Sequence, residues 1–499
     1  MKEKTSSDKR PKPLEPPRLA TGITGLDDIL DGGFPANRIY LVEGDPGTGK
    51  TTLGMQFLME GAARGEAGLY ITLSETKEEL LGVASSHGWT IDDLEIYELT
   101  PPGEALKAES QYTIFHPSEI ELGETTSAVL REVERVQPSR VVFDSLSEMR
   151  LMAREPLRFR RQILALKQYF AGRQSTVLLL DDKVYEGQDL QVQSIAHGVI
   201  SLEQLAVEYG AERRRLRVTK LRGSRFRGGF HDFCILTGGL AVFPRLVAAE
   251  HRRKFTKETM RSGIHELDEL IGGGLDRGSS TLIIGPAGSG KSSLGSQFAD
   301  AAARGGTHTA VFIFDELRET FISRASGMGI DIQGHLAKGL ITIQQVDPAE
   351  LSPGQFTHAV REAVDRDDAG LVIIDSLNGY LNAMPDERFL TMQMHELLTY
   401  LNQQGVVTLM IMAQHGFVGA MATPVDVSYL ADAVVMIRYF EAQGAIHRAV
   451  SVVKKRTGSH ESTIREFHLS AAGIVVGKPL TNFRGVLTGV PIYDGSSAG

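Results

Sequence analysis

Cysteine and long hydrophobic runs are both scarce in this sequence. Cys234 is the only cysteine among 499 residues, which excludes an internal disulfide and a cysteine-based metal site. No apolar run approaches the roughly 20 residues that span a bilayer, and the N-terminus lacks the apolar core of a secretion signal. We therefore expect a cytoplasmic protein without a membrane partner.

Positively charged residues are fewer than negatively charged ones. The chain has 53 Lys and Arg against 62 Asp and Glu, a net charge of −9. This balance argues against a protein that coats nucleic acid through its overall charge. It does not exclude nucleic-acid binding by a local basic groove. The hydrophobic share of 42% is typical of a globular protein. The length suits two domains of about 200 to 250 residues each.

A repeat with a fixed spacing dominates what is present. The segment TGITGLDDIL, which begins at Thr21, matches SGIHELDELI, which begins at Ser262, 241 residues later. The loops GDPGTGKT and GPAGSGKS follow with the same spacing, lysine to lysine from Lys50 to Lys291. Matching at one fixed offset indicates a duplicated domain.

Composition predicts the boundaries of the two copies. Residues 1–16 are rich in Lys, Pro and Ser and are expected to be a disordered arm. We expect a first domain over 17–247 and a charged linker over 248–262. A second domain over 263–490 and a short tail over 491–499 complete the chain.

Each half alternates short apolar runs with amphipathic segments. RIYLVEG and LVIIDS are examples of the apolar runs, and KEELLGVASSHG, which begins at Lys77, has a helical pattern. Such strands belong to a parallel sheet that helices cover on both faces. Late hairpins that turn at Gly210 and Gly444 predict an antiparallel extension. The expected fold class is α/β, with two tandem P-loop domains of this kind.

The two glycine-rich loops carry the pattern G-x-x-x-x-G-K-[ST]. Its glycines let backbone N–H groups encircle phosphates, its lysine contacts the β- and γ-phosphates, and its hydroxyl binds Mg²⁺. A plain glycine-rich turn is the alternative. ATP and Mg²⁺ are the predicted cofactors. The predicted phosphate-binding residues are Gly44, Gly47, Thr48, Gly49, Lys50, Thr51 and Thr52, and in the second half Gly285, Gly288, Ser289, Gly290, Lys291, Ser292 and Ser293.

A magnesium site also needs an acid at the end of a neighbouring strand. RVVFDS ends in Asp144 and LVIIDS in Asp375. We predict that these aspartates hold the metal together with Thr51 and Ser292. Capping of the following helix is the alternative role for both.

Hydrolysis further needs a carboxylate that orients water. Glu75 in ITLSET is the candidate in the first half, and Asp315 with Glu316 in FIFDEL are the candidates in the second. Ser74 stands where the second half has Asp315, so the two sites differ. These acids could instead begin an exposed helix.

Two pairs of cations lie on late strands. Lys220 and Arg222 belong to KLRGS, and Lys454 and Arg456 to KKRTG. Alternate strand residues point the same way, so each pair can bind one anion. If a pair lies far from its own P-loop, that anion could be a nucleotide on a neighbouring subunit. The alternatives are an exposed basic strand edge and, for the nearby ERRRLR, nucleic-acid contact.

In combination these motifs resemble the KaiC family of circadian clock ATPases, within the RecA superfamily. The resemblance rests on TGITGLDDIL, the acids in SET and DEL, the strands FDSL and IDSL, KLRGS, and TIREFHLS, and it covers residues 18 to 485. It implies two RecA-like domains in a two-tiered homohexamer, with ATP between neighbouring subunits. It further implies ATPase activity in the first domain, and ATPase, autokinase and phosphatase activity in the second.

The resemblance also assigns roles to single residues. Asp315 and Glu316 match the acid pair that activates water and the hydroxyl acceptor, while only Glu75 remains of that pair in the first half. The two cation pairs match those offered to a neighbour's γ-phosphate. The family's acceptor segment has adjacent Ser and Thr, whereas this chain has Ser428 and Tyr429. Ser428 is therefore the candidate phosphoacceptor.

The expected function is that of a KaiC-like, ATP-hydrolysing hexameric signalling protein, with serine/threonine autokinase activity as a hypothesis for the second domain. Asp315 replaces a glutamate of the family with a side chain one methylene shorter, and a catalytic base is sensitive to such a displacement. The prediction of kinase activity is therefore weaker than that of ATPase activity. No KaiA partner is expected, since the family's long tail is missing, while a KaiB-like partner is open. The alternatives are a RecA-type DNA-dependent ATPase and a scaffold that binds ATP only to assemble.

Overall fold

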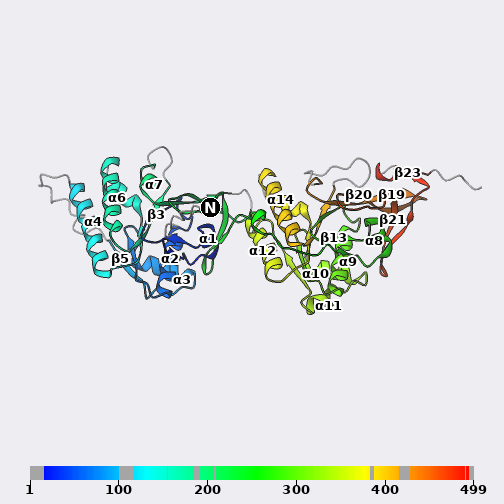
Figure 1. Ribbon diagram of the computed structural model, residues 1–499, viewed down its shortest axis with the longest axis horizontal. Helices are drawn as coiled ribbons and strands as arrows, with labels where there is room; N and C mark the ends of the chain where they lie inside the picture. Colours follow the sequence, from blue (N-terminus) through cyan, green and yellow to red (C-terminus); the bar gives the residue numbers. More distant parts are fainter. Residues whose placement is uncertain are drawn as a thin grey trace, which may run out of the picture. The chain divides into compact units, whose positions relative to one another are not determined.

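The computed structural model describes residues 16–99, 117–153, 155–183, 190–206, 210–382, 387–414, 428–488 and 491–493. The chain divides into two compact units, one over Met1–Glu208 and Glu212–Arg245 and the other over Tyr209–Ala211 and Leu246–Gly499. Each unit has one large sheet with helices packed on it (Figure 1). In the described part of the chain, no helix combines the length and apolarity that crossing a membrane requires.

The first domain has a nine-stranded sheet among its described residues, in the order β11-β10-β9-β8-β3-β7-β6-β4-β5. The six strands from β8 to β5 in this order are parallel, and β9, β10 and β11 extend the sheet with antiparallel pairing. The strands are β3 (Ile39–Gly44), β4 (Gly68–Thr72), β5 (Glu95–Glu98), β6 (Arg140–Asp144), β7 (Thr176–Asp182), β8 (Gly198–Leu205), β9 (Arg213–Leu221), β10 (His231–Leu236) and β11 (Gly239–Phe243).

Helices cover both faces of this sheet, which explains why its central strands are apolar throughout. Tyr40 and Val42 belong to one buried cluster with residues of the first three helices, and Ile39 and Leu41 belong to a second cluster with residues of the next four. This alternation follows from the two-residue repeat of a strand. The helices are α1 (Thr24–Ile29), α2 (Lys50–Ala63), α3 (Lys77–Ser86), α4 (Pro117–Val136), α5 (Leu146–Ala153), α6 (Pro156–Ala171) and α7 (Leu190–Ile195).

The second domain repeats the architecture. Its sheet has the order β16-β15-β17-β18-β14-β19-β20-β21-β22, with the last three strands antiparallel. These strands are β14 (Ser280–Gly285), β15 (Thr309–Ile313), β16 (Ile341–Gln345), β17 (Leu371–Asp375), β18 (Val407–Ala413), β19 (Ala433–Ala442), β20 (Ala445–Lys455), β21 (Ile464–Ser470) and β22 (Gly473–Pro479). The helices are α8 (His265–Ile271), α9 (Lys291–Arg304), α10 (Arg318–Ser326), α11 (Ile332–Ala337), α12 (Pro353–Asp365), α13 (Leu377–Asn382) and α14 (Glu387–Gln404).

Short elements complete the two domains. They are the two-stranded pairs β1 (Arg18–Leu19) with β2 (Phe34–Pro35), β12 (Thr259–Met260) with β13 (Leu275–Asp276), and β23 (Phe483–Arg484) with β24 (Ile492–Tyr493), and the 3₁₀ helices η1 (Ala248–Glu250) and η2 (Val486–Thr488).

The predicted fold class is confirmed, including the late antiparallel extension. Gly444 turns between β19 and β20 with a φ of 72°, a left-handed conformation that favours glycine. Gly210 has a φ of 99° in the connection from β8 to β9. Each extension carries its sheet beyond the central strands on the side of β8 or β19.

A buried histidine in β10 makes the stability of the first domain depend on pH. His231 Nδ1 accepts a hydrogen bond from the backbone N–H of Arg245 at 2.9 Å, and Nε2 lies 3.0 Å from the carbonyl oxygen of Arg227. Burial lowers the pKa of His231 from 6.5 to about 4. The folded domain therefore disfavours the charged ring, so its stability is complete above pH 6.5 and is lost as pH falls from 6.5 towards 4.

We expect the first domain to lose about 2 kcal/mol of unfolding free energy through this group between pH 7 and pH 5. Trp89 is the only tryptophan of the chain and lies in the first domain, so its fluorescence during urea titration reports unfolding of that domain. His231→Gln keeps a donor and an acceptor but cannot titrate, and it should remove this part of the loss. An equal loss in the variant would contradict the assignment.

Candidate nucleotide-binding sites

Each P-loop joins the carboxyl end of a central strand to the start of a helix. In the first domain β3 ends at Gly44 and α2 begins at Lys50, and in the second β14 ends at Gly285 and α9 begins at Lys291. The glycine before each lysine has a φ of 92° or 104°, and a Cβ there would lie 2.9 or 2.7 Å from a neighbouring methyl group. Both loops therefore require glycine at this position.

The two P-loop lysines have different partners. Lys50 Nζ donates to the carbonyl oxygen of Gly44 at 2.8 Å and forms an ion pair with Asp182 at 2.9 Å. Lys291 Nζ donates to the carbonyl oxygen of Pro286 at 2.8 Å, and burial lowers the pKa of Lys291 to about 8. The first lysine thus has a carboxylate partner, which a phosphate would have to displace.

The predicted metal ligands of the first domain lie together. Thr51 Oγ1 donates to Asp144 Oδ2 at 2.9 Å, and Tyr70 donates to the same oxygen at 2.5 Å. Burial raises the pKa of the Asp144 carboxyl. A hydroxyl beside a carboxylate is a suitable donor set for Mg²⁺, which prefers oxygen ligands.

The second domain has the same pairing of a P-loop hydroxyl with an aspartate, and one oxygen of that aspartate has no hydrogen-bond partner among the described residues. The Ser292 hydroxyl is hydrogen bonded to Asp375, whose pKa burial raises to about 6. Asp375 Oδ2 is buried and has no hydrogen-bond partner among the described residues. A cation would relieve the cost of this buried oxygen, so the residues present fit a metal-bound nucleotide.

The candidate catalytic acid of the first domain is half-buried beside two other carboxylates. Glu75 follows β4, and its Oε2 atom is buried without a hydrogen-bond partner in the described part of the chain. Burial raises the pKa of Glu75, and the nearby carboxylates of Asp144 and Glu79 raise it further. A carboxylate with a raised pKa and a free oxygen is suited to accept a proton from water.

The two acids of the second domain are both engaged by neighbouring side chains. Asp315 accepts a hydrogen bond from the Ser376 hydroxyl. Glu316 forms an ion pair with Arg324, whose NH1 lies 2.8 and 2.5 Å from its two oxygens. The sites therefore differ in what holds the acids as well as in their number.

The cation pair of the first domain converges on one helix end. Lys220 lies in β9, Arg222 follows that strand, and the two donate to the carbonyl oxygens of Gln193 at 2.6 Å and Ser194 at 2.8 Å. Both side chains thus lie on one side of the strand, as their spacing predicts.

The matching pair of the second domain contacts the candidate acceptor segment. Lys454 Nζ donates to the carbonyl oxygen of Ser428 at 2.8 Å, and Arg456 donates to that of Tyr429 at 2.6 Å. Residues 415–427, which precede Ser428, lie outside the described residues. The geometry brings the predicted acceptor and the predicted cations together.

Three residues of these sites were not predicted from the sequence. Tyr70 contacts Asp144, the predicted metal ligand of the first domain, and Asp182 contacts Lys50, a predicted phosphate ligand. In the second domain Arg324 contacts Glu316. Asp182 ends the apolar run TVLLLDD, which is the same signal that identified Asp144. Tyr70 and Arg324 carry no such signal.

We expect Asp182→Ala to strengthen nucleotide binding in the first domain about fivefold. In this variant Lys50 would not have to break its ion pair with Asp182 before it binds a phosphate. Asp182 pairs with Gly44 across the sheet, and Ala413 pairs with Gly285 at the same place in the second domain. Ala413→Asp is therefore the matched control and should weaken binding there. Titration of a fluorescent ATP analogue measures both effects, and unchanged affinities would contradict this role of Asp182.

Comparison with known proteins decides the family. The family model of the KaiC ATPase matches residues 19–247 and again 260–481. The chain belongs to the KaiC family. It is 27% identical to the circadian clock protein KaiC3 of Synechocystis sp., over 96% of this chain and 95% of that protein. It is 26% identical to the circadian clock oscillator protein KaiC of Acaryochloris marina, over 96% and 92%.

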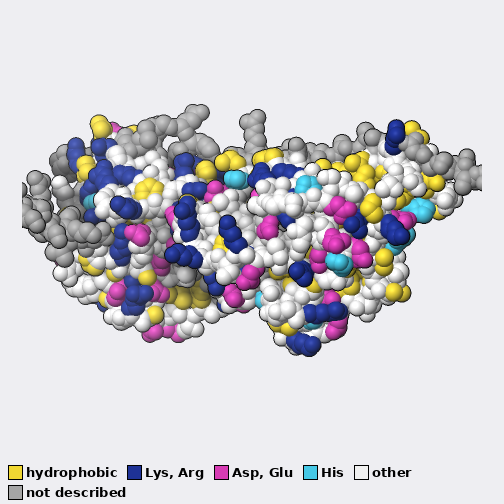
Figure 2. Space-filling model, turned by 45° about the vertical axis from the view of Figure 1, so that its right-hand side comes forward, with side chains coloured by type: hydrophobic (Ala, Val, Ile, Leu, Met, Phe, Trp, Pro, Cys, Tyr) yellow, Lys and Arg dark blue, Asp and Glu magenta, His cyan; other side chains and the backbone are white. Residues whose placement is uncertain are grey.

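In this KaiC-family ATPase the basic run ERRRLR lies on β9 and is largely paired. Arg214 contacts Glu212 at 2.7 Å, and Arg215 contacts Glu203 at 2.8 Å while stacking over the Phe230 ring. Figure 2 shows Lys and Arg side chains interspersed with Asp and Glu over the visible face. Paired arginines are weak support for the alternative of a DNA-dependent ATPase.

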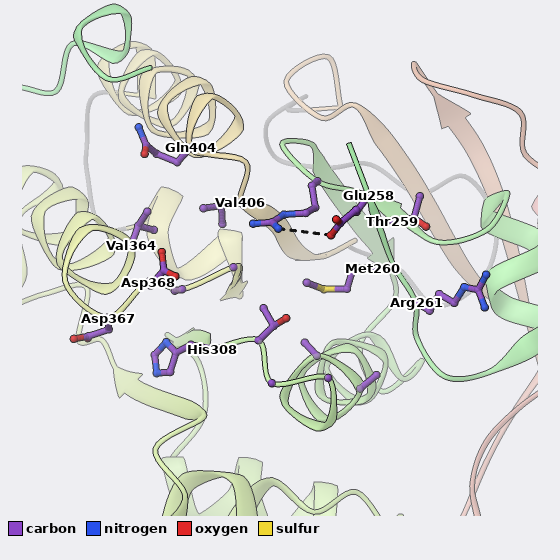
Figure 3. Close-up of a pocket in the computed structure, with 18 of the residues that line it drawn as sticks. Glu258, Thr259, Met260, Arg261, His308, Val364, Asp367, Asp368, Gln404 and Val406 are labelled. Atoms are coloured by element: carbon purple, nitrogen blue, oxygen red, sulfur yellow. Dashed lines mark ion pairs between the residues drawn. The ribbon is translucent and has the colours of Figure 1, made fainter. Parts of the chain in front are cut away.

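The second KaiC domain also has a hollow of about 530 Å³ away from the nucleotide site (Figure 3). His308 and Gly370, which line it, precede β15 and β17, so it lies at the amino ends of the strands, opposite the P-loop. Four of its charged side chains pair with one another, Arg277 with Glu258 at 3.9 Å and Arg253 with Asp368 at 2.9 Å. No predicted site residue is among those described as lining it.

Proposed function

We propose that this KaiC-family ATPase forms a two-tiered homohexamer that holds Mg-ATP between neighbouring chains. Slow hydrolysis would set a conformational or phosphorylation state that another signalling protein, KaiB-like in the simplest case, reads. The observation that supports this proposal is the position of the two cation pairs relative to the P-loops of their own domains.

Each cation pair lies towards the sheet edge opposite its own P-loop. Lys220 pairs with Val199 in β8, and Val199 pairs with Leu41 in β3, three residues before Gly44. Strand geometry places Lys220 roughly 14 Å from Gly44, before the P-loop itself begins.

The second domain has the same arrangement through Lys454, Val434 and Leu282. A cation pair this far from the P-loop of its own domain is better placed to contact a nucleotide held by a neighbouring chain. The head-to-tail contacts of a ring would bring the two together.

The residues of the site supply the chemistry of phosphoryl transfer by position and charge. Lys50 and Lys291 would bind the phosphates, and Glu75 would orient water in the first domain. Thr51 with Asp144, and Ser292 with Asp375, would hold Mg²⁺, which when bound neutralises charge on the β- and γ-phosphates. The neighbour's cations would then stabilise the charge of the transition state.

A mixing experiment tests whether the sites are shared between chains. Lys291→Ala and Arg456→Ala each disable the second site, and Lys50→Ala in both chains silences the first. Neither chain alone should hydrolyse ATP. In a random mixed ring, about a quarter of the contacts combine an intact Lys291 with an intact neighbouring Arg456.

We therefore expect mixing to restore about a quarter of the second-domain rate. As a control, chains that carry both Lys454→Ala and Arg456→Ala are mixed with Lys291→Ala chains in the same way, and the same share of the rate should return. A mixture as inactive as its parts would contradict a shared site. Activity in the Arg456→Ala chain alone would show that the cation is not needed.

We further propose that Ser428 is a phosphoacceptor of the second domain. Its carbonyl oxygen is hydrogen bonded to Lys454, so a nucleotide that these cations contact would lie near this segment. Asp315 and Glu316 are the acids that would receive the hydroxyl proton.

Intact mass after incubation with Mg-ATP, followed by mapping of added phosphate, tests the autokinase. Phosphate on Ser428 that disappears in Ser428→Ala and in Asp315→Asn/Glu316→Gln would support it. Continued ATP turnover with an unchanged mass would contradict it, and would leave an ATPase whose conformation is the signal.

A further inference from the structure

The two domains differ at a helix position that, in the second domain, contacts the candidate catalytic acid. Arg324 in α10 of the second domain and Val83 in α3 of the first are separated by the 241 residues of the repeat. Arg324 NH1 donates to both oxygens of Glu316, at 2.8 and 2.5 Å. Val83 packs against the apolar core of its domain.

The ion pair of the second domain is partly shielded from water. The side chains of Arg324 and Glu316 are 30% and 20% exposed. Arg324 lies over the Phe321 ring at 5.1 Å, and its Nε and NH2 atoms are buried without an acceptor among the described residues. Glu316 is thus the acceptor that compensates a largely desolvated guanidinium, which favours a persistent pair over a surface one.

Glu75 of the first domain has no such constraint. No ion pair to Glu75 occurs in the described part of the chain, and the charges that act on it come from Asp144 and Glu79. One of its oxygens is buried without a partner. One oxygen of Glu75 therefore has both lone pairs free to orient water, whereas each oxygen of Glu316 already has one lone pair engaged and is held in place by Arg324.

We propose that Arg324 is a positioning residue that holds Glu316 away from water and makes the second domain the slower of the two ATPase sites. Asp315, which has no ion pair in the described part of the chain, then remains as the acid for a reacting hydroxyl or water. The inference rests on the proposed nucleotide-binding role of both sites. It assigns the difference between the two sites to one side chain in the second domain and its apolar counterpart in the first.

A reciprocal exchange in the full chain tests the inference. Arg324→Val is measured with Lys50→Ala, so that only the second site turns over, and Val83→Arg with Lys291→Ala, so that only the first does. We expect kcat of the second site to rise about tenfold and kcat of the first to fall about tenfold. KM, and the affinity for a non-hydrolysable ATP analogue, should stay unchanged, because neither residue binds the nucleotide.

Arg324→Lys provides a second variant that preserves the charge without the forked contact, and its kcat should fall between those of the parent and Arg324→Val. Unchanged kcat in both exchanges would overturn the inference while leaving the proposed function intact. A loss of analogue affinity in Arg324→Val would also overturn it, by making Arg324 a phosphate ligand. Absence of turnover in the parent chain itself would overturn the ATPase proposal and the inference together.

Discussion

Replacement of Lys291 by alanine is expected to remove nucleotide binding from the second domain. The Lys291 ammonium is buried at the start of α9 and donates only to the carbonyl oxygen of Pro286 among the described residues. Its charge is free to meet the β- and γ-phosphates, and its loss should weaken ATP binding by about a hundredfold or more. Equilibrium dialysis should then find one nucleotide per chain in place of two.

Two controls make this result specific. Lys338→Ala removes an exposed lysine of the same domain and should leave two nucleotides per chain. Lys50→Ala should also leave one, and the double P-loop variant none. Two nucleotides on the Lys291→Ala chain would show that the second P-loop does not hold the phosphates.

Replacement of Glu75 by glutamine is expected to lower hydrolysis in the first domain by about a hundredfold. The amide keeps the size of the side chain but cannot accept a proton from water. Because a residue that only orients water makes no contact with the phosphates, affinity for ATP should be unchanged. Phosphate release by a Lys291→Ala chain, in which only the first site turns over, measures the effect.

Glu78→Gln is the matched control, since Glu78 is exposed in the first turn of α3. It should leave the rate within about twofold of the parent. A normal rate in Glu75→Gln would place the catalytic base elsewhere. A loss of ATP affinity equal to the loss of rate would make Glu75 a binding residue instead.

Much of the fold follows from short patterns. The apolar runs that end at Gly44 and Asp144 are β3 and β6, and the helix expected from Lys77 is α3. These patterns are readable because both faces of a covered parallel sheet need apolar side chains, and because a turn such as that at Gly444 favours glycine.

The contacts that distinguish the two sites were not readable in the same way. Asp182 reaches Lys50 because β7 lies beside β3, although more than a hundred residues separate the two strands, and strand order is not a local property of the sequence. Arg324 meets Glu316 only through the start and direction of α10. The sequence alone therefore points to the candidate acids and lysines, but it does not show which side chains form ion pairs with them.

Both nucleotide sites lie on one polypeptide, and this has a consequence for the cell. Translation delivers the two sites in a fixed ratio of one to one, so changes in gene expression cannot alter their relative amounts. A difference in rate between the two sites is then set within the assembled protein and not by the relative abundance of two proteins. On the proposals made above, Asp182, Arg324 and Val83 are the residues at which point mutation would adjust that balance while gene dosage stays constant.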